Sequence, residues 1–255
     1  MGDLTGKTAV VTGASGQANF GSIIARRLAA EGANVVVSAR RREPLQALAE
    51  EIGGLAVTCD VSDESQIEGL FTAASERYGK VDMAVYSTGF QVFGAIAELD
   101  AEQIRPTLET SFVGALLFFK HAAASMVDGG SVVTMSSLTA RLPGPGMAVY
   151  AGTRAGIDYA IQVAAVEYAA RKVRFNSVAA GLIKTDMTAG FFEMQPIIDA
   201  HLKQTPCGRM GTLDDVAEAV LYLLDDNRSG YVNGQVLDLS GGQHMGQLPH
   251  FDELL

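Results

Sequence analysis

A serine, a tyrosine and an arginine in the middle of the chain have the types and spacing that acid–base chemistry at a carbonyl requires. Tyr150 and Arg154 are four residues apart in an Ala-rich segment, so on a helix they share one face. A fixed cation there stabilises tyrosinate and lowers the tyrosine pKa from about 10 toward neutrality. Ser137 can hydrogen-bond a carbonyl oxygen or its alkoxide. The residue types alone still favour the alternative of a surface serine and a helical tyrosine beside an exposed arginine.

A glycine-rich turn near the beginning of the chain has the composition of a phosphate site. Gly13, Gly16 and Gly21 lie between an apolar run and an amphipathic helical pattern. A strand, a glycine-rich turn and a helix place backbone N–H groups and a helix N-terminus against a pyrophosphate. Glycine is needed because a Cβ would block close approach. The alternative is an ordinary tight βα turn, but the position directly after the first strand favours phosphate binding.

Three arginines follow the second apolar run. Sites for NAD usually carry a carboxylate about 20 residues beyond the glycines, where it accepts a bond from the ribose 2′-OH. Here Arg40 lies 19 residues beyond Gly21, within Ala39-Arg40-Arg41-Arg42. Guanidinium groups suit a 2′-phosphate, because they donate charge-assisted, bidentate bonds. The alternative is a solvated charge run that opens a helix. The sequence favours NADP(H) over NAD(H).

Short β-branched runs alternate with longer Ala/Leu-rich segments along the chain. Strands are expected at Thr8–Val11, Asn34–Val37, Leu55–Thr58, Met83–Val85, Ser131–Met135, Val173–Val178 and Gln235–Leu239. Helices are expected near 21–31, 43–52, 63–78, 101–127, 149–170 and 213–224. The alternation predicts an α/β fold, a doubly wound Rossmann-type parallel sheet of about seven strands with helices on both faces, as one domain over 1–255. Residues 186–206 are expected to form a lid near the substrate, and 241–255 a tail, either mobile or docked on another subunit.

Composition and charge narrow the class of protein further. The 255 residues are 48% hydrophobic and 19% charged, which is enough to fill a sizeable core. The net charge of −10 disfavours nucleic acid and anionic membranes as partners, while a local site can still bind an anionic cofactor. Two cysteines and four scattered histidines predict no disulfide framework and no metal. Because no signal peptide or membrane span is evident, a cytoplasmic protein is expected.

Residues 131–187 carry the most specific pattern. It contains Ser137 at the end of an expected strand, Tyr150 and Arg154 as Y-x-x-x-R, and a loop that ends at Thr185. Together with Thr12-Gly13, the CDVSD run and the closing SGG, this pattern resembles the classical short-chain dehydrogenase/reductase family over about residues 5–242. The resemblance implies an oxidoreductase that interconverts a ketone and a secondary alcohol by hydride transfer to or from NAD(P), with Tyr150 as acid/base. It also implies a homo-oligomer, a tetramer or a dimer, of which we expect the tetramer.

The resemblance assigns roles to individual positions. The implied catalytic residues are Ser137, Tyr150, Arg154 and Ser111. The implied cofactor-binding residues are Gly13, Ser15, Gly16, Gly21, Arg40, Asp60, Val61, Gly89, Tyr150, Arg154, Ile183 and Thr185. For Asp60, a helix N-cap is the alternative, a role that Ser62 or Asp63 could fill equally well. A cleft lining of Phe90, Val92, Phe93, Met147, Met187, Phe191, Phe192 and Met194 suggests a bulky apolar carbonyl or alcohol, unless these residues fill the core or a subunit contact.

Four positions depart from the family's pattern. Arg154 replaces a lysine, Ser111 an asparagine, Tyr86-Ser87-Thr88-Gly89 an Asn-Asn-Ala-Gly, and Ala180-Gly181 a Pro-Gly. Arginine keeps the charge but cannot readily shuttle a proton, because its pKa exceeds about 12. We expect the role of the tyrosine to survive while the proton relay changes. These departures also support an alternative function, a dinucleotide-binding sensor or assembly protein with little or no catalysis. A hydrolase role for Ser137 is disfavoured, because no histidine with a supporting carboxylate lies in a matching context.

Overall fold

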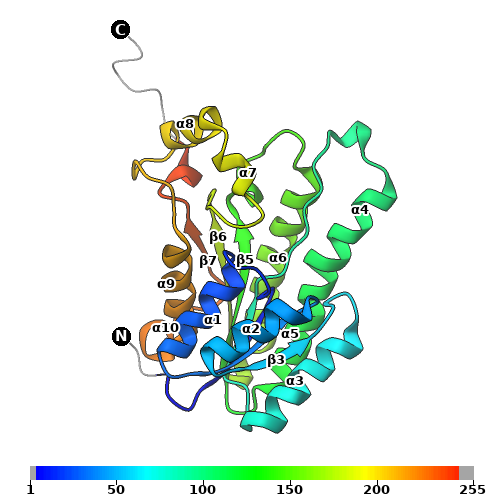
Figure 1. Ribbon diagram of the computed structural model, residues 1–255, viewed down its shortest axis with the longest axis vertical. Coiled ribbons are helices and arrows are strands. Elements are labelled where there is room, and N and C mark those ends of the chain that lie inside the picture. Colours follow the sequence, from blue (N-terminus) through cyan, green and yellow to red (C-terminus); the bar gives the residue numbers. More distant parts are fainter. Residues whose placement is uncertain (1–3, 247–255) are drawn as a thin grey trace.

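The computed structural model describes residues 4–246, which form one parallel sheet of seven strands (Figure 1). The strand order is β3-β2-β1-β4-β5-β6-β7. The strands are β1 (Thr8–Thr12), β2 (Asn34–Ala39), β3 (Leu55–Thr58), β4 (Met83–Tyr86), β5 (Gly130–Ser137), β6 (Val173–Ala180) and β7 (Val236–Leu239). Every neighbouring pair is parallel. The predicted doubly wound Rossmann-type fold is therefore confirmed.

Helices cover both faces of the sheet, which explains why its strands are apolar on both sides. In β1, Val11 faces one core and Val10 the other, and both are fully buried. The first core is completed by α1 (Phe20–Ala30), α2 (Arg42–Ile52) and α9 (Leu213–Leu224). The second is completed by α3 (Glu64–Tyr78), α5 (Gly114–Ser125) and α6 (Ala148–Glu167).

The segment expected to be helical near residues 101–127 is helical from Ala101 to Ser125, but a π-helical turn divides it. The chain forms α4 (Ala101–Leu108), a π-helical turn over Glu109–Val113 and then α5. At the end of this turn the N–H of Gly114 bonds the carbonyl of Glu109, five residues back. Such turns are frequent at functional sites.

The segment after β6 contains helices that the sequence pattern did not indicate. These are α7 (Ala189–Phe192) and α8 (Gln195–Lys203), which lie together at one end of the molecule (Figure 1). Two further elements are α10 (Asp226–Ser229) and a 3-10 turn at Gln243–Met245. The rest of the expected tail, residues 247–255, lies outside the described residues.

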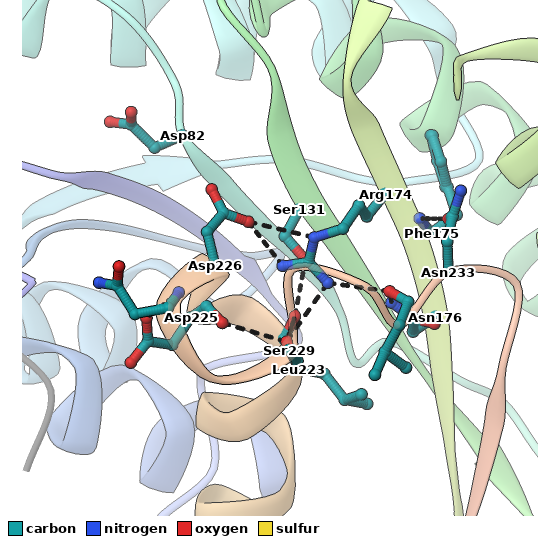
Figure 2. A network of polar contacts seen from close by, with 12 residues as sticks. Asp82, Ser131, Arg174, Phe175, Asn176, Leu223, Asp225, Asp226, Ser229 and Asn233 are labelled. Carbon is teal, nitrogen blue, oxygen red and sulfur yellow. Dashed lines mark hydrogen bonds and ion pairs between the residues drawn. The ribbon is translucent and has the colours of Figure 1, made fainter. Parts of the chain in front are cut away.

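A buried arginine fixes the end of the sheet opposite to the carboxyl ends of the strands (Figure 2). Arg174, near the start of β6, is 8% exposed and donates to the carboxylate of Asp226 at 2.8 and 3.1 Å. It also donates to the Ser229 hydroxyl and the Val232 carbonyl. The Asn176 amide bonds the Val232 carbonyl and the N–H of Gln235. These bonds hold the connection between α10 and β7 against β6.

Candidate active site

The residues predicted to do chemistry meet at the carboxyl ends of β4, β5 and β6. Ser137 is the last residue of β5, and Tyr150 lies in the first turn of α6. Both line a cavity of about 360 Å³ that also takes Ala180 from the end of β6. Ligands of open α/β sheets bind at this edge, where the strand order reverses.

Arg154 is buried against Tyr150, so the exposed-arginine alternative is wrong. The side chain is 6% exposed, and its guanidinium carbon lies 5.0 Å from the centre of the Tyr150 ring. Its Nη1 donates to the carbonyl of Met135 at 2.9 Å. Burial raises the pKa of Tyr150, but the charge of Arg154 and hydrogen bonds from the Gln91, Ser137 and Arg154 side chains outweigh it. The resulting pKa lies below the usual value for tyrosine.

Gly89, three residues after the end of β4, makes room for the same guanidinium. A Cβ on Gly89 would lie 2.1 Å from Nη2 of Arg154, so any side chain here would displace the arginine. The remaining donor, Nε of Arg154, is buried and has no hydrogen-bond partner in the protein. An unpaired buried donor is costly, and a ribose hydroxyl bound at this point would satisfy it. This observation fits a nicotinamide riboside beside Tyr150.

Ser137 is oriented by the turn that follows it. Its hydroxyl oxygen accepts bonds from the N–H and the hydroxyl of Thr139, at 3.2 and 3.0 Å. The serine proton is therefore directed elsewhere, and the Ser137 side chain helps to lower the pKa of Tyr150. A carbonyl oxygen in the cavity can take the same two donors, Ser137 and Tyr150.

Ser111 contacts the loop after β4. It is fully buried in the π-helical turn, where its hydroxyl accepts from the N–H of Phe90 at 3.2 Å and lies 3.4 Å from the carbonyl of Phe90. The hydroxyl is thus engaged with the backbone. Within the described structure its contact with Tyr150 is indirect, through residues 89–91.

The glycine-rich turn opens onto a second cavity, of about 320 Å³. Gly13 has φ +70°, and a Cβ there would lie 2.9 Å from the carbonyl oxygen of Ser87. Gly16 lies in the same turn, whereas Gly21 is the second residue of α1, which has Asn19 as its N-cap. The cavity lining is Gly13, Ser15, Ser38, Ala39, Arg40, Arg41, Cys59, Asp60, Val61, Thr88 and Thr110. A backbone cradle that excludes a Cβ, beside a cavity with two arginines, fits the adenosine half of a dinucleotide.

The three arginines after β2 differ in position. Arg40 and Arg41 line the cavity, whereas Arg42 begins α2. Arg41 donates to the carbonyl of Ser15 at 2.8 Å and to its hydroxyl at 3.3 Å, which ties α2 to the glycine-rich turn. This contact was not foreseen in the sequence, because Ser15 and Arg41 lie 26 residues apart.

Asp60 lies on the wall of the same cavity. Its carboxylate accepts from the N–H and hydroxyl of Ser62, at 3.0 and 2.7 Å. These bonds are the main cause of a pKa below the usual value, and the charge of Arg40 adds to the effect. The N-cap of α3 is Asp63, so the N-cap alternative for Asp60 is wrong.

The first cavity gathers half of the predicted substrate residues. Phe93, Met147, Met187 and Phe191 line it, whereas Phe90, Val92, Phe192 and Met194 do not. Phe93 and Phe191 meet edge to face, with ring centres 6.4 Å apart. Ile183 and Thr185 also line it, as the predicted nicotinamide loop requires. Sequence reasoning missed Phe20, Gln91, Ile197 and His201, which reach the cavity from a helix start, a loop and α8.

Neither a candidate metal site nor a candidate membrane-spanning helix is found among residues 4–246. No group of three or more His, Cys, Asp or Glu side chains in this range could hold a metal ion. Over the same residues, no helix is both long and apolar enough to span a bilayer.

Comparison with known proteins identifies the family. Residues 13–244 match the family model described as enoyl-(acyl carrier protein) reductase. The chain belongs to the short-chain dehydrogenase/reductase family. A short-chain type dehydrogenase/reductase from Mycobacterium ulcerans superposes with a TM-score of 0.89 at 30% identity, over 98% of this chain and 94% of that one.

Named relatives within the family act on different compounds. Carbonyl reductase family member 4 of Danio rerio is 33% identical over 92% of this chain and 97% of its own length. 3beta-hydroxysteroid dehydrogenase 1 of Eggerthella lenta is 34% identical over 94% of both chains. The chain is thus an oxidoreductase of a family that uses nicotinamide dinucleotides.

Proposed function

We propose that this protein is an NADP(H)-preferring reductase of bulky apolar ketones, or a dehydrogenase of the matching secondary alcohols. The observation that carries the proposal is the buried guanidinium of Arg154, 5.0 Å from the Tyr150 ring, where Tyr150 and Ser137 line one cavity. Burying a cation costs free energy unless nearby groups compensate for it, and a tyrosinate at Tyr150 would do so.

The residues divide the chemistry of ketone reduction among them. A bound dihydronicotinamide supplies the hydride that adds to the carbonyl carbon. Tyr150 gives its hydroxyl proton to the carbonyl oxygen, and Ser137 donates a hydrogen bond to that oxygen as negative charge develops. Arg154 stabilises the tyrosinate that remains. In alcohol oxidation the tyrosinate accepts the hydroxyl proton instead.

Cofactor and substrate preference follow from the two cavities. Arg40 and Arg41 line the adenosine side, where Ala39 stands in place of a carboxylate, and this supports preference for a 2′-phosphate. Phe93, Met147 and Phe191 give the substrate side an apolar wall. The names of two relatives, a carbonyl reductase and a hydroxysteroid dehydrogenase, are consistent with such substrates.

We further propose a homo-oligomer, a tetramer or a dimer. Several apolar side chains of α5 and α6 are exposed, among them Leu116, Tyr159, Val163 and Val166. An exposed apolar face of this kind supports a contact between subunits. Sedimentation at several concentrations tests it, and a monomer at all of them would contradict it.

A cofactor-loaded screen of ketones and alcohols, from small to polycyclic, tests the main proposal. We expect a higher kcat/KM with NADPH than with NADH, and the best turnover with large apolar substrates. Ala39→Asp with Arg40→Ile should reverse the cofactor preference, because a carboxylate accepts from a 2′-OH and repels a 2′-phosphate. Equal or better use of NADH by the wild type would contradict the preference. Tight cofactor binding without turnover of any substrate would favour the sensor or assembly alternative.

A further inference from the structure

The loop after β4 begins in a fixed place beside the catalytic residues. Gly89 packs directly on the guanidinium of Arg154. The next residue, Phe90, is held through its backbone N–H and carbonyl by the buried hydroxyl of Ser111. One side chain from the π-helical turn thus fixes the backbone immediately before Gln91.

The other end of the loop is tied to the start of α6. The N–H of Gly94 donates to the carbonyl of Gly146 at 3.0 Å, just before the helix that carries Tyr150. Between these two anchors, Gln91 lines the cavity together with Ser137 and Tyr150. The Gln91 side chain is among the groups that lower the pKa of Tyr150. Gln91 therefore faces the cavity that holds Tyr150 from the side of the loop, while Ser137 faces it from the end of β5.

We propose that Gln91 is a further catalytic residue, whose amide N–H stabilises the Tyr150 oxygen when that oxygen has given up its proton. Ser111 is the positioning residue for Gln91, because it holds the backbone at Phe90. The proposal rests on the proposed function for the role of Tyr150 in turnover. It gives the tyrosinate three neighbours, the charge of Arg154 and two neutral donors, Ser137 and Gln91. An amide does not titrate, so this donor is present at every working pH.

Gln91→Leu keeps much of the side-chain volume and removes the donor. In alcohol oxidation the rate rises with pH as Tyr150 loses its proton. We expect Gln91→Leu to move this rising limb of the pH–rate profile to higher pH by about one unit and to lower kcat about tenfold. Gln91→Glu should move it further, because a carboxylate repels the tyrosinate. Ser111→Ala should move it in the same direction, but less. Gln46→Leu makes the same change at an exposed position of α2, outside both cavities, and should leave the limb in place.

A second measurement does not depend on turnover. The chain has seven tyrosines, so the tyrosinate absorbance of Tyr150 is isolated by subtracting the titration of the matching Tyr150→Phe protein. We expect Gln91→Leu to move this titration to higher pH. If Gln91→Leu shifted the absorbance titration but the wild type turned over no substrate, the role of Gln91 beside Tyr150 would be supported and the proposed function contradicted. The inference would be overturned if Gln91→Leu turned over substrate with both the Tyr150 absorbance titration and the pH–rate profile unchanged. It would also be overturned if only Gln91→Glu, and not Gln91→Leu, shifted them.

Discussion

Arg154 shows how one substitution rearranges a site without removing its charge. The guanidinium has more donors than an ammonium group, and it uses Nη1 on the Met135 carbonyl while Nε remains for a ligand. Its planar shape fits against Gly89, where no side chain could be placed. A lysine would reach neither contact in the same way.

The charge of Arg154 should be visible in kinetics. Arg154→Met removes the main group that lowers the pKa of Tyr150 against burial, so the rise of alcohol oxidation with pH should move to higher pH. Cofactor binding should weaken by about 1.4 kcal/mol, which is a factor of about ten in affinity, because a donor to the ribose is lost. A pH–rate profile and a fluorescence titration measure both effects.

Arg154→Lys is the matched control. It keeps the charge and should retain more activity than Arg154→Met, although the Met135 carbonyl loses the guanidinium N–H that it accepts from. An unchanged profile and unchanged cofactor affinity in Arg154→Met would show that the arginine takes no part in the site.

For individual residues, the sequence predicted which side chains belong to the site better than it predicted their contacts. The family pattern identified Ser137, Tyr150 and Arg154, and the structure brings them together. It could not reveal Gln91, because the residue stands in a loop and acquires its place only through Ser111 and Gly94. Nor could it separate Phe93 from Phe90, since that depends on which way each side chain of the loop turns.

Among the elements, α1 connects stability most directly to cofactor binding. It starts at Phe20, behind the glycine-rich turn, with a capping box in which Asn19 accepts from the N–H of Ser22 at 2.8 Å. The free N–H groups of this first turn are those that a pyrophosphate would meet.

Asn19→Ala removes the cap. We expect a loss of about 1 kcal/mol in the free energy of unfolding and weaker cofactor binding, because the first turn of α1 frays. Urea denaturation and a fluorescence titration measure the two effects. Asn19→Ser restores a capping oxygen and should recover most of both. If Asn19→Ala bound cofactor as tightly as the wild type, the start of α1 would not be the phosphate site.

The elements were predictable where a short-range pattern decides them. Five of the seven predicted strands are one to three residues longer in the structure, and the helix at 213–224 has the expected bounds. The π-helical turn and the short helices α7 and α8 were not, because their conformations depend on tertiary contacts. Asp186 illustrates this: its carboxylate accepts from the N–H of Ala18, 168 residues away.

Over the whole molecule, an acidic surface surrounds a site that is locally basic. The net charge is −10, yet two arginines line the adenosine cavity and a third lies beneath Tyr150. Local arrangement of charge, and not its total, decides whether an anionic cofactor can bind.

A buried carboxyl group on α6 should make global stability depend on pH. Asp158 is 9% exposed, and burial raises its pKa even though a hydrogen bond from Ser177 and the charges of Arg141 and Arg154 oppose this. A raised pKa in the folded state gives stability below the unfolded pKa of about 3.9, and this is lost as pH rises through the folded value.

Asp158→Asn removes that loss. The free energy of unfolding of the variant, relative to the wild type, should therefore increase as pH rises from about 4 to 7. Urea denaturation at a series of pH values measures it, with Asp128→Asn, a change at an exposed carboxylate, as control. A constant difference across this range would show that Asp158 titrates alike in both states.

Replacing Tyr150 by Phe tests the central claim most directly. The variant keeps the ring beside Arg154 and loses only the hydroxyl, so NADPH binding measured by fluorescence should be nearly unchanged. Hydride transfer to a ketone, followed in a single turnover, should fall by a factor of about a hundred or more, the usual contribution of a positioned proton donor. Single-turnover rates in Tyr150→Phe equal to those of the wild type would contradict the assignment of Tyr150 as the acid/base of this protein.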